Sequence, residues 1–450
     1  MKINLKSCLT ALIMAGATST SFAQAIVIND QNDLAANSNL AGDPSAYILD
    51  GDIFTVDGVF NISGTGRPNL VIDKAATEMS LGTSGAAGQI TAGGLSLSNG
   101  KLILGGAQSR DALVLNRNGL NLSGGEIQAT GGTSGGSDGL YINAGGLRIS
   151  EGDLNATGGS GNFALGVRIE KGGVVQDGGT ITATTGSGRE AHGLLISGGG
   201  GYTLNGGQLT AISDSSQSTT IGVRVDSGNY VQNGGVLNAQ GGNGNTSSGF
   251  IVLSGLFQIN DGEINAVGGG GSYAYGIDVR NEVSMRGGAV NLTGGTYNTA
   301  YGLGATNYSF SQTGGSLRST GGGVSGAHGL RVRNYTLSGG TLEGAGGIGS
   351  GAYGIYTTGL TQTGGHGVFT GGSDPAMSTA LGLAVFGAYD QQGGDIAATG
   401  GSGNRSYGFY ATNFNQSSGF MTAEGGAGSE AHGLNVFNTL TQNGGYIFGR

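Results

Sequence analysis

The sequence contains one cysteine, three prolines and few charged residues. Its single cysteine, Cys8, lies within the first 25 residues, so disulfides and thiolate metal sites are excluded from the rest of the chain. Three prolines among 450 residues are too few for a collagen triple helix, although 100 residues are glycine. Charged residues make up 10% of the chain, which leaves little material for ion-pair networks. The fold must therefore depend on backbone ladders and on small apolar side chains.

Despite these absences, the chain has enough apolar material to build a core. Apolar residues make up 37% of it, with 16 tyrosines and 14 phenylalanines, so it is not a disordered Gly/Ser tract. No stretch approaches the roughly 18 to 20 uninterrupted apolar residues that a transmembrane helix needs. The formal net charge is −9, and an acidic chain with few lysines is not expected to bind nucleic acid or an anionic membrane surface.

Residues 1–25 have the three parts of a secretory signal peptide. Two lysines precede an apolar run at residues 9–17, and small residues follow at residues 21–25. Cleavage is expected after Ala23 or Ala25. The mature chain is thus predicted to be exported and to contain no cysteine.

A glycine followed by an apolar-x-apolar triplet recurs at steps of 25 to 29 residues, most often 27. A fixed period of this length is typical of a repeat architecture. Two further units can be recognised upstream, beginning near Gly85 and Ala112, so the repeat occupies residues 85–450. The unit glycines are Gly139, Gly166, Gly193, Gly222, Gly249, Gly276, Gly302, Gly329, Gly354, Gly382, Gly408 and Gly433.

Each unit contains three short segments with the period-2 pattern of a half-buried strand. In unit 139–165 they begin at Leu140, Leu147 and Leu154. The residue after the unit glycine is apolar in every unit while the next one varies freely, which indicates one buried and one exposed face. The third segment has a column of alanines, and the second has a column of glutamines that we expect to hydrogen-bond along the stack. These glutamines are Gln176, Gln232, Gln312, Gln362, Gln391, Gln416 and Gln442.

A 27-residue unit cannot bury its own apolar face, but parallel copies stacked about 4.8 Å apart can bury it together. The sequence therefore predicts an all-β protein, a right-handed parallel β-helix (solenoid) with about 27 residues and three strands per coil. Gly-Gly pairs are expected at the corners, where a positive φ is needed. Residues 85–450 would form about 13 coils plus a partial last coil, a rod roughly 60 Å long. Residues 26–84 lack the period and are predicted to form an N-terminal cap or irregular β region.

No residue pattern predicts a catalytic, cofactor or metal site. Acids on the outer face of the first strand, such as Glu170, Asp226 and Asp278, lie on alternate coils beside an arginine, which favours a solvated charged face over paired catalytic carboxylates. The glycine corners lack the aspartate of calcium-binding solenoids. Three histidines share the position before the unit glycine but are four or five coils apart, roughly 19 to 24 Å, too far to share a metal. They are His192, His328 and His432.

One group of side chains predicts contact with another molecule. Towards the C-terminal end, the charges on the outer face of the first strand give way to aromatic residues, which suit sugar stacking or protein contact if they are exposed. These candidate contact residues are Tyr353, Tyr356, Phe386, Tyr407, Tyr410 and Phe437.

A signal peptide followed by Gly-rich units such as residues 176–183 and 232–239 resembles the passenger region of Gram-negative autotransporter (type V secreted) adhesins. The resemblance implies Sec export, transit through the periplasm, and display at the cell surface or outer membrane, or release to the outside. It also implies a C-terminal outer-membrane translocator barrel, and no run of barrel strands is recognisable in this sequence.

The expected function is therefore that of a non-enzymatic cell-surface or secreted β-helix, a stalk or adhesin that mediates attachment or cell-cell contact. Its partners would be surface glycans or proteins of a host or neighbouring cell, or other copies of the chain, and no cofactor is expected. One alternative is a polysaccharide-acting, pectate-lyase-like enzyme on the same scaffold. The other is a truncated passenger without function.

Overall fold

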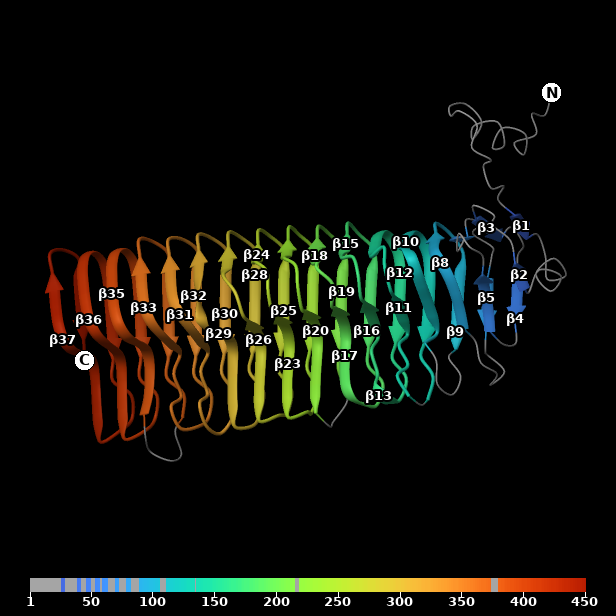
Figure 1. The fold of residues 1–450 in the computed structure, drawn as a ribbon. Helices are drawn as coiled ribbons and strands as arrows, with labels where there is room; N and C mark the ends of the chain where they lie inside the picture. Colours follow the sequence, from blue (N-terminus) through green and yellow to red (C-terminus); the bar gives the residue numbers. More distant parts are fainter. Residues whose placement is uncertain are drawn as a thin grey trace, which may run out of the picture.

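The computed structural model describes residues 89–105, 111–133, 135–214, 218–373 and 379–450, together with seven short strands between residues 26 and 81. All regular secondary structure in this part of the chain is β-strand. It contains no helix that is long and apolar enough to cross a membrane. The strands wind into one stack of coils, seen from the side in Figure 1. The proposed signal peptide at residues 1–25 lies outside the described residues.

Three parallel ladders run the length of the stack, each formed by one segment from every coil. In the first ladder Leu140 pairs with Val167, which pairs with Leu194 in the next coil. The same register shift, mostly 27 residues, relates neighbours in the other two ladders. The prediction of a parallel β-solenoid with three strands and about 27 residues per coil is therefore confirmed.

The strands can be grouped by ladder, and several long strands pass through more than one. The first ladder contains β2 (Asn39–Ala41), β5 (Val59–Ser63), β11 (Leu140–Ile142), β14 (Val167–Ile169), β17 (Gly188–Ile196), β20 (Thr219–Val225), β23 (Thr246–Val252) and β26 (Tyr273–Val279), and β13 (Gly161–Phe163) pairs with the start of β17. The second contains β1 (Ile26–Ile28), β3 (Ala46–Leu49), β6 (Asn69–Ile72), β15 (Val174–Gln176), β18 (Tyr202–Leu204), β21 (Tyr230–Gln232), β24 (Phe257–Ile259) and β27 (Val283–Met285).

The third ladder contains β4 (Ile53–Val56), β7 (Glu78–Leu81), β9 (Lys101–Gly105), β16 (Thr180–Thr184), β19 (Gln208–Ile212), β22 (Val236–Gln240), β25 (Glu263–Val267), β28 (Ala289–Thr293), β30 (Ser316–Thr320), β32 (Thr341–Ala345), β34 (His366–Thr370) and β38 (Tyr446–Gly449). Strands that continue from one ladder into another are β8 (Gln89–Leu97), β10 (Leu113–Thr130), β12 (Leu147–Thr157), β29 (Thr299–Gln312), β31 (Leu330–Leu337), β33 (Ile355–Gln362), β35 (Thr379–Thr399), β36 (Arg405–Glu424) and β37 (Glu430–Gln442).

Residues 26–84, predicted to be an N-terminal cap, contribute seven strands to the same stack. Strands β1, β3 and β6 pair in parallel one after another, and β6 pairs with β8. Strand β5 also pairs with β8, and β7 pairs with β9. The ladders of the repeat region thus continue into this segment, although its sequence lacks the glycine signature of the later units.

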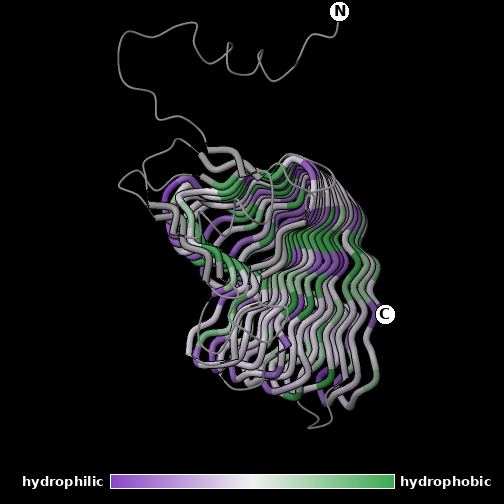
Figure 2. Tube along the Cα trace, turned by 90° about the vertical axis from the view of Figure 1, so that its right-hand side faces the viewer, coloured by the Kyte–Doolittle hydropathy of each residue, from purple (hydrophilic) through white to green (hydrophobic). Residues whose placement is uncertain are grey.

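Stacking makes each position of the coil a column of similar side chains. Figure 2 shows these columns as hydrophobic and hydrophilic stripes that run along the stack. The inward columns form one continuous core, in which Leu140, Leu154 and Ala156 are at most 1% exposed. A further column of small residues, two before the unit glycine, is also buried, as Ala191, Ala274 and Ala300 show. The core is therefore narrow and continuous.

The glutamine column lies inside the core and satisfies the polar groups of a corner. The Gln312 amide donates to the carbonyl of Thr341 at 2.9 Å, and its oxygen accepts from the Tyr335 hydroxyl at 2.6 Å. Towards the C-terminal end the amides bond directly to one another, Gln416 to Gln391 and Gln442 to Gln416, both at 3.0 Å. The predicted amide ladder is thus present there, while buried tyrosines also serve as partners elsewhere.

Glycine has two separate roles in the coil. At the corner between the second and third ladders, Gly179, Gly207 and Gly235 have φ of 64°, 77° and 70°, which residues with a side chain rarely adopt. The unit glycines instead lie where the chain presses against the third ladder. A Cβ on Gly249 would lie 2.8 Å from the carbonyl oxygens of Ala239 and Gly276. The backbone at Gly249 can therefore lie this close to the neighbouring carbonyl groups only because glycine has no side chain.

We expect Gly249→Ala to lower the free energy of unfolding by about 2–3 kcal/mol, because the new methyl group would overlap backbone atoms that cannot move without disturbing two ladders. Chemical denaturation followed by circular dichroism would measure the change. Gly199→Ala is the matched control, since a Cβ there would meet nothing closer than Ser227 Oγ at 4.0 Å. Equal stability of the two variants would contradict the role assigned to the unit glycine.

Candidate functional site

Two columns of side chains share one outer face of the stack, and we call them together the outer strip. One column is the residue immediately before each unit glycine, and the other is the second residue after it. The ring of His328 in the first column lies 5.5 Å from the ring of Tyr356 in the second. Ala327, directly before His328, points into the core and is fully buried. The side chains immediately before the unit glycine and two residues after it therefore point to the same side of the stack, so the two columns lie next to each other.

The members of the outer strip follow from the strand register. The first column is Asp111, Asp138, Leu165, His192, Ile221, Ser248, Tyr275, Tyr301, His328, Tyr353, Leu381, Tyr407 and His432. The second is Val114, Tyr141, Arg168, Leu195, Arg224, Ile251, Asp278, Gly304, Arg331, Tyr356, Ala384, Tyr410 and Asn435.

The C-terminal half of the outer strip carries a row of nine rings. Neighbouring ring centroids are 4.7 to 6.5 Å apart, so the row is continuous across the coils from Tyr275 to His432. The rings are Tyr275, Tyr301, His328, Tyr353, Tyr356, Phe386, Tyr410, Tyr407 and His432. Phe386 joins the strip from the next outward position of its strand.

Five of the six predicted contact residues belong to this row: Tyr353, Tyr356, Phe386, Tyr407 and Tyr410. The sixth, Phe437, is 73% exposed and makes no ring contact with another described residue. The members differ in accessibility, since Phe386 is 40% exposed and Tyr407 only 8%.

The geometry of the row limits what it can bind. His328 and Tyr353 stack face to face at 4.8 Å with an interplanar angle of 6°, and Tyr301 covers the other side of His328 at 4.9 Å. Their faces are occupied by one another, so they stabilise the coil stack and present only edges to solvent. Phe386 is tilted by 31° from Tyr356 and by 45° from Tyr410, which leaves part of its face open to a sugar ring or an apolar side chain.

An arginine is inserted among the rings. The Arg331 guanidinium lies 5.3 Å from the centroid of Tyr301 and 5.2 Å from that of Tyr356, and it donates to the Tyr301 hydroxyl. Such cation–π contacts hold the charge in one place. Burial, together with the charge of Arg331, lowers the pKa of the adjacent His328 to about 3. His328 is therefore neutral at physiological pH, and it is not an acid–base group.

The N-terminal end of the outer strip has different chemistry. Asp111 and Asp138 occupy adjacent coils of the first column, and the Asp138 backbone N–H donates to Asp111 Oδ1 at 2.7 Å. Asp138 is 3% exposed, and its Oδ1 has no hydrogen-bond partner. Burial and, to a smaller extent, the charge of Asp111 raise the pKa of Asp138 to about 8, against the opposing charge of Arg168 at 3.9 Å. Burial also raises the pKa of Asp111.

Sequence reasoning missed this carboxyl pair because it compared acids that follow the first residue of a unit, such as Glu170 and Asp278, whereas Asp111 and Asp138 directly precede it. Once Ala112 is aligned with Gly139, Asp111 falls in the same column as Asp138. The acids singled out from the sequence, Glu170, Asp226 and Asp278, each pair with an arginine two residues away. Examples are Arg224 with Asp226 at 2.6 Å and Arg280 with Asp278 at 3.3 Å.

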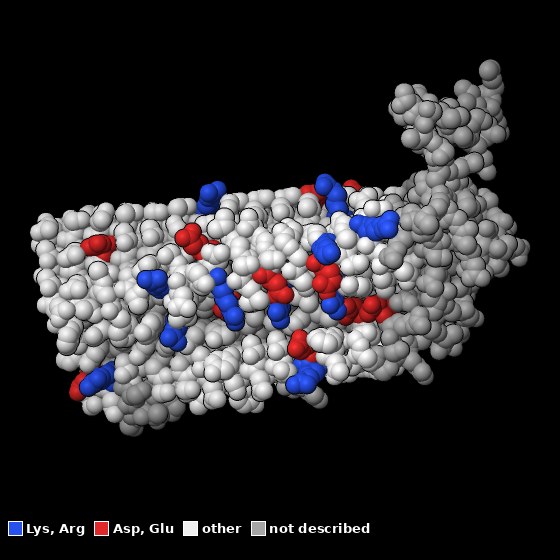
Figure 3. All heavy atoms as spheres, viewed as in Figure 1, with Lys and Arg blue, Asp and Glu red and all other residues white. Residues whose placement is uncertain are grey.

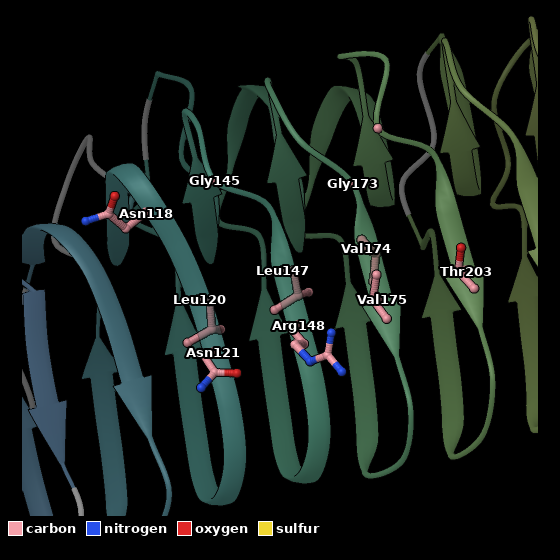
Figure 4. A pocket seen from close by; sticks show the side chains of 11 residues that line it. Asn118, Leu120, Asn121, Gly145, Leu147, Arg148, Gly173, Val174, Val175 and Thr203 are labelled. Atoms are coloured by element: carbon pink, nitrogen blue, oxygen red, sulfur yellow. The ribbon is translucent and has the colours of Figure 1, made fainter.

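The remaining candidates offer little chemistry. In the part of the chain that the structure describes, no group of three or more His, Cys, Asp or Glu side chains could hold a metal ion. A shallow depression of about 450 Å³ lies on the outer face of the second ladder, between Asn118 and Thr203 (Figure 4). Its only charged side chain, Arg148, already binds Asp177 at 2.7 Å. The outer strip is thus the better candidate site.

The comparisons with known proteins give no match. No family model matches the chain, and no curated protein or solved structure is significantly similar to it.

We expect the free energy of unfolding of the wild type, measured relative to that of Asp138→Asn, to fall as the pH rises from about 4 to about 8. The folded pKa of Asp138, about 8, exceeds its ordinary value of 3.8, so its ionisation progressively disfavours the folded state over this interval. Over this interval the change in the free energy of unfolding should differ between the two proteins by at least about 1 kcal/mol.

Denaturation at a series of pH values would measure these changes. The control is Asp261→Asn, because Asp261 is exposed at a corner, where its carboxylate accepts a hydrogen bond from the backbone N–H of Gly262. Parallel pH profiles of the wild type and Asp138→Asn would contradict the assignment of a neutral, buried carboxyl group.

Proposed function

We propose that the chain is a non-enzymatic stalk or adhesin of the autotransporter passenger type, exported and acting at the cell surface or outside the cell. The observation that carries this proposal is the row of rings on a continuous stack of coils, in which Phe386 and His432 are exposed and Tyr353, Tyr356 and Tyr410 are partly exposed. The backbone groups of each strand are used within the ladders, so contacts with other molecules fall to the outward side chains. A continuous rod holds such contacts at a distance from its base.

The absence of cysteine after Cys8 and the scarcity of charge also support this proposal. A chain without disulfides can cross an envelope unfolded and then add one coil to the next, each coil serving as a template for the following ladder segments. The partners would be glycans or proteins on another cell, or further copies of the chain.

The test is attachment by the purified full chain coupled to fluorescent beads. We expect the beads to bind to a panel of bacterial or host cells, or to cluster with one another, well above albumin-coated beads. Flow cytometry and microscopy would measure the two outcomes. Failure to attach to cells and to cluster would contradict the proposal and favour a passenger without function.

A polysaccharide-acting enzyme is the second candidate, and the Asp111–Asp138 pair is the observation that favours it. A carboxyl group with a pKa of about 8 is protonated near neutrality, as a general acid must be. Against this role, Asp138 is 3% exposed and out of reach of a polymer bound at the surface. Release of reducing or unsaturated ends from a polysaccharide panel, abolished in Asp138→Asn, would establish the enzyme and remove the stalk proposal.

A further inference from the structure

Two arginines on the outer face of β31 lack an acidic partner. Arg331 and Arg333 flank the buried Val332, so both point outward, about 6 to 7 Å apart along the strand. Neither forms a salt bridge with a described residue, whereas arginines elsewhere in the described part of the chain commonly do. Figure 3 shows that several charges on one face of the molecule lie as adjacent opposite pairs. The two guanidinium groups are therefore left to attract an anion from outside.

The coil of β31 and its two neighbours carry a small positive excess although the whole chain is acidic. Between residues 302 and 381 the sequence contains three arginines and two acids, Glu343 and Asp374. Glu343 already pairs with Arg318 in the third ladder. Since charges further away than about 8–10 Å are largely screened at physiological salt, this local excess determines which ligands are attracted.

The guanidinium of Arg331 is held in place before any ligand arrives. It lies between the rings of Tyr301 and Tyr356 and donates to the Tyr301 hydroxyl. Its Nε is buried without a hydrogen-bond partner. A side chain that is already ordered loses less conformational entropy on binding, which favours a specific anion contact over a diffuse one. Arg333, in contrast, is exposed and can adapt to the ligand.

A partly open ring lies beside the arginines. Phe386 is 40% exposed and lies 4.7 Å from Tyr356, whose ring is in contact with Arg331. Tyr410 continues the row at 5.3 Å from Phe386. Fixed cations beside apolar ring surface match a ligand that carries acidic groups on otherwise stackable rings.

We infer that this part of the outer strip binds an acidic polysaccharide, with Arg331 and Arg333 contacting its carboxylate or sulfate groups and Phe386 stacking against a sugar ring. The inference rests on the proposed function and names the ligand class of its contact surface. An acidic protein could also satisfy the arginines, and polyglutamate represents it in the binding test.

Binding of the purified full chain to three immobilised polymers tests the inference: polygalacturonate for carboxylates, heparin for sulfates, and dextran as a neutral polymer. We expect binding to at least one acidic polymer and none to dextran, with affinity that falls as the salt concentration rises. Arg331→Gln combined with Arg333→Gln should weaken binding at least tenfold, and Phe386→Ala severalfold. Biolayer interferometry would measure these affinities.

The matched control is Arg148→Gln combined with Arg318→Gln, which removes the same charge from two arginines that already have acidic partners. It should change the affinity less than twofold, and circular dichroism would verify that all variants keep the β-solenoid. Equal loss in the control pair, or binding to polyglutamate as tight as to the polysaccharides, would overturn the inference.

Bead attachment, measured on the same preparations, separates the two proposals. If the beads attach to cells but neither acidic polymer binds, the ligand assignment is wrong and the adhesin proposal stands. If neither attachment nor binding occurs, both are wrong.

Discussion

The parallel hydrogen-bonded ladder between successive coils is the constraint on which the rest of the structure depends. Each backbone segment has its partner one coil away, about 4.8 Å along the stack. Residues about 27 positions apart in the sequence therefore become nearest neighbours, as Leu140, Val167 and Leu194 do. Equivalent side chains of successive coils therefore form columns, both in the core and on the outer face.

Stacking favours side chains that interact well with an identical side chain in the next coil. Amide side chains do so because each has both a donor and an acceptor. The hydrogen bonds from Gln442 to Gln416 and from Gln416 to Gln391 use both groups of Gln416. Aromatic rings also stack well, as the nearly parallel faces of His328 and Tyr353 show. Two carboxylates in adjacent coils repel each other. Where Asp111 and Asp138 are adjacent, the raised pKa of Asp138 keeps that carboxyl group neutral. Unlike charges pair instead, either two residues apart in one coil, as in Arg224 and Asp226, or across neighbouring coils, as in Arg318 and Glu343.

The same constraint determines where a ligand can bind. Inward columns are filled, and the strand backbones are occupied within the ladders, so recognition falls to outward side chains. The outer strip differs from the other faces because the unit glycine brings two outward columns together. This proximity allows Arg331 to lie between Tyr301 and Tyr356, which belong to different columns. A single column of side chains could not place aromatic rings on two sides of one guanidinium group, as Tyr301 and Tyr356 are placed around Arg331.

The repeat in the sequence was sufficient to determine the ladders, the inward columns and the positive-φ corners, because all of these depend on local spacing and on glycine alone. Five of the six aromatic residues named from the sequence also proved to be neighbours, since their columns could be counted.

Only the tertiary structure decided which faces of those rings are open, which arginines lack a partner, and that Asp111 adjoins Asp138. These properties depend on how separate columns fold against one another around the unit glycine, and the period of the sequence carries no information about distances between columns. The tertiary structure also showed that the seven strands before residue 84 belong to the stack. They join the stack through backbone pairing with β8 and β9, and backbone pairing does not require a repeated side-chain pattern.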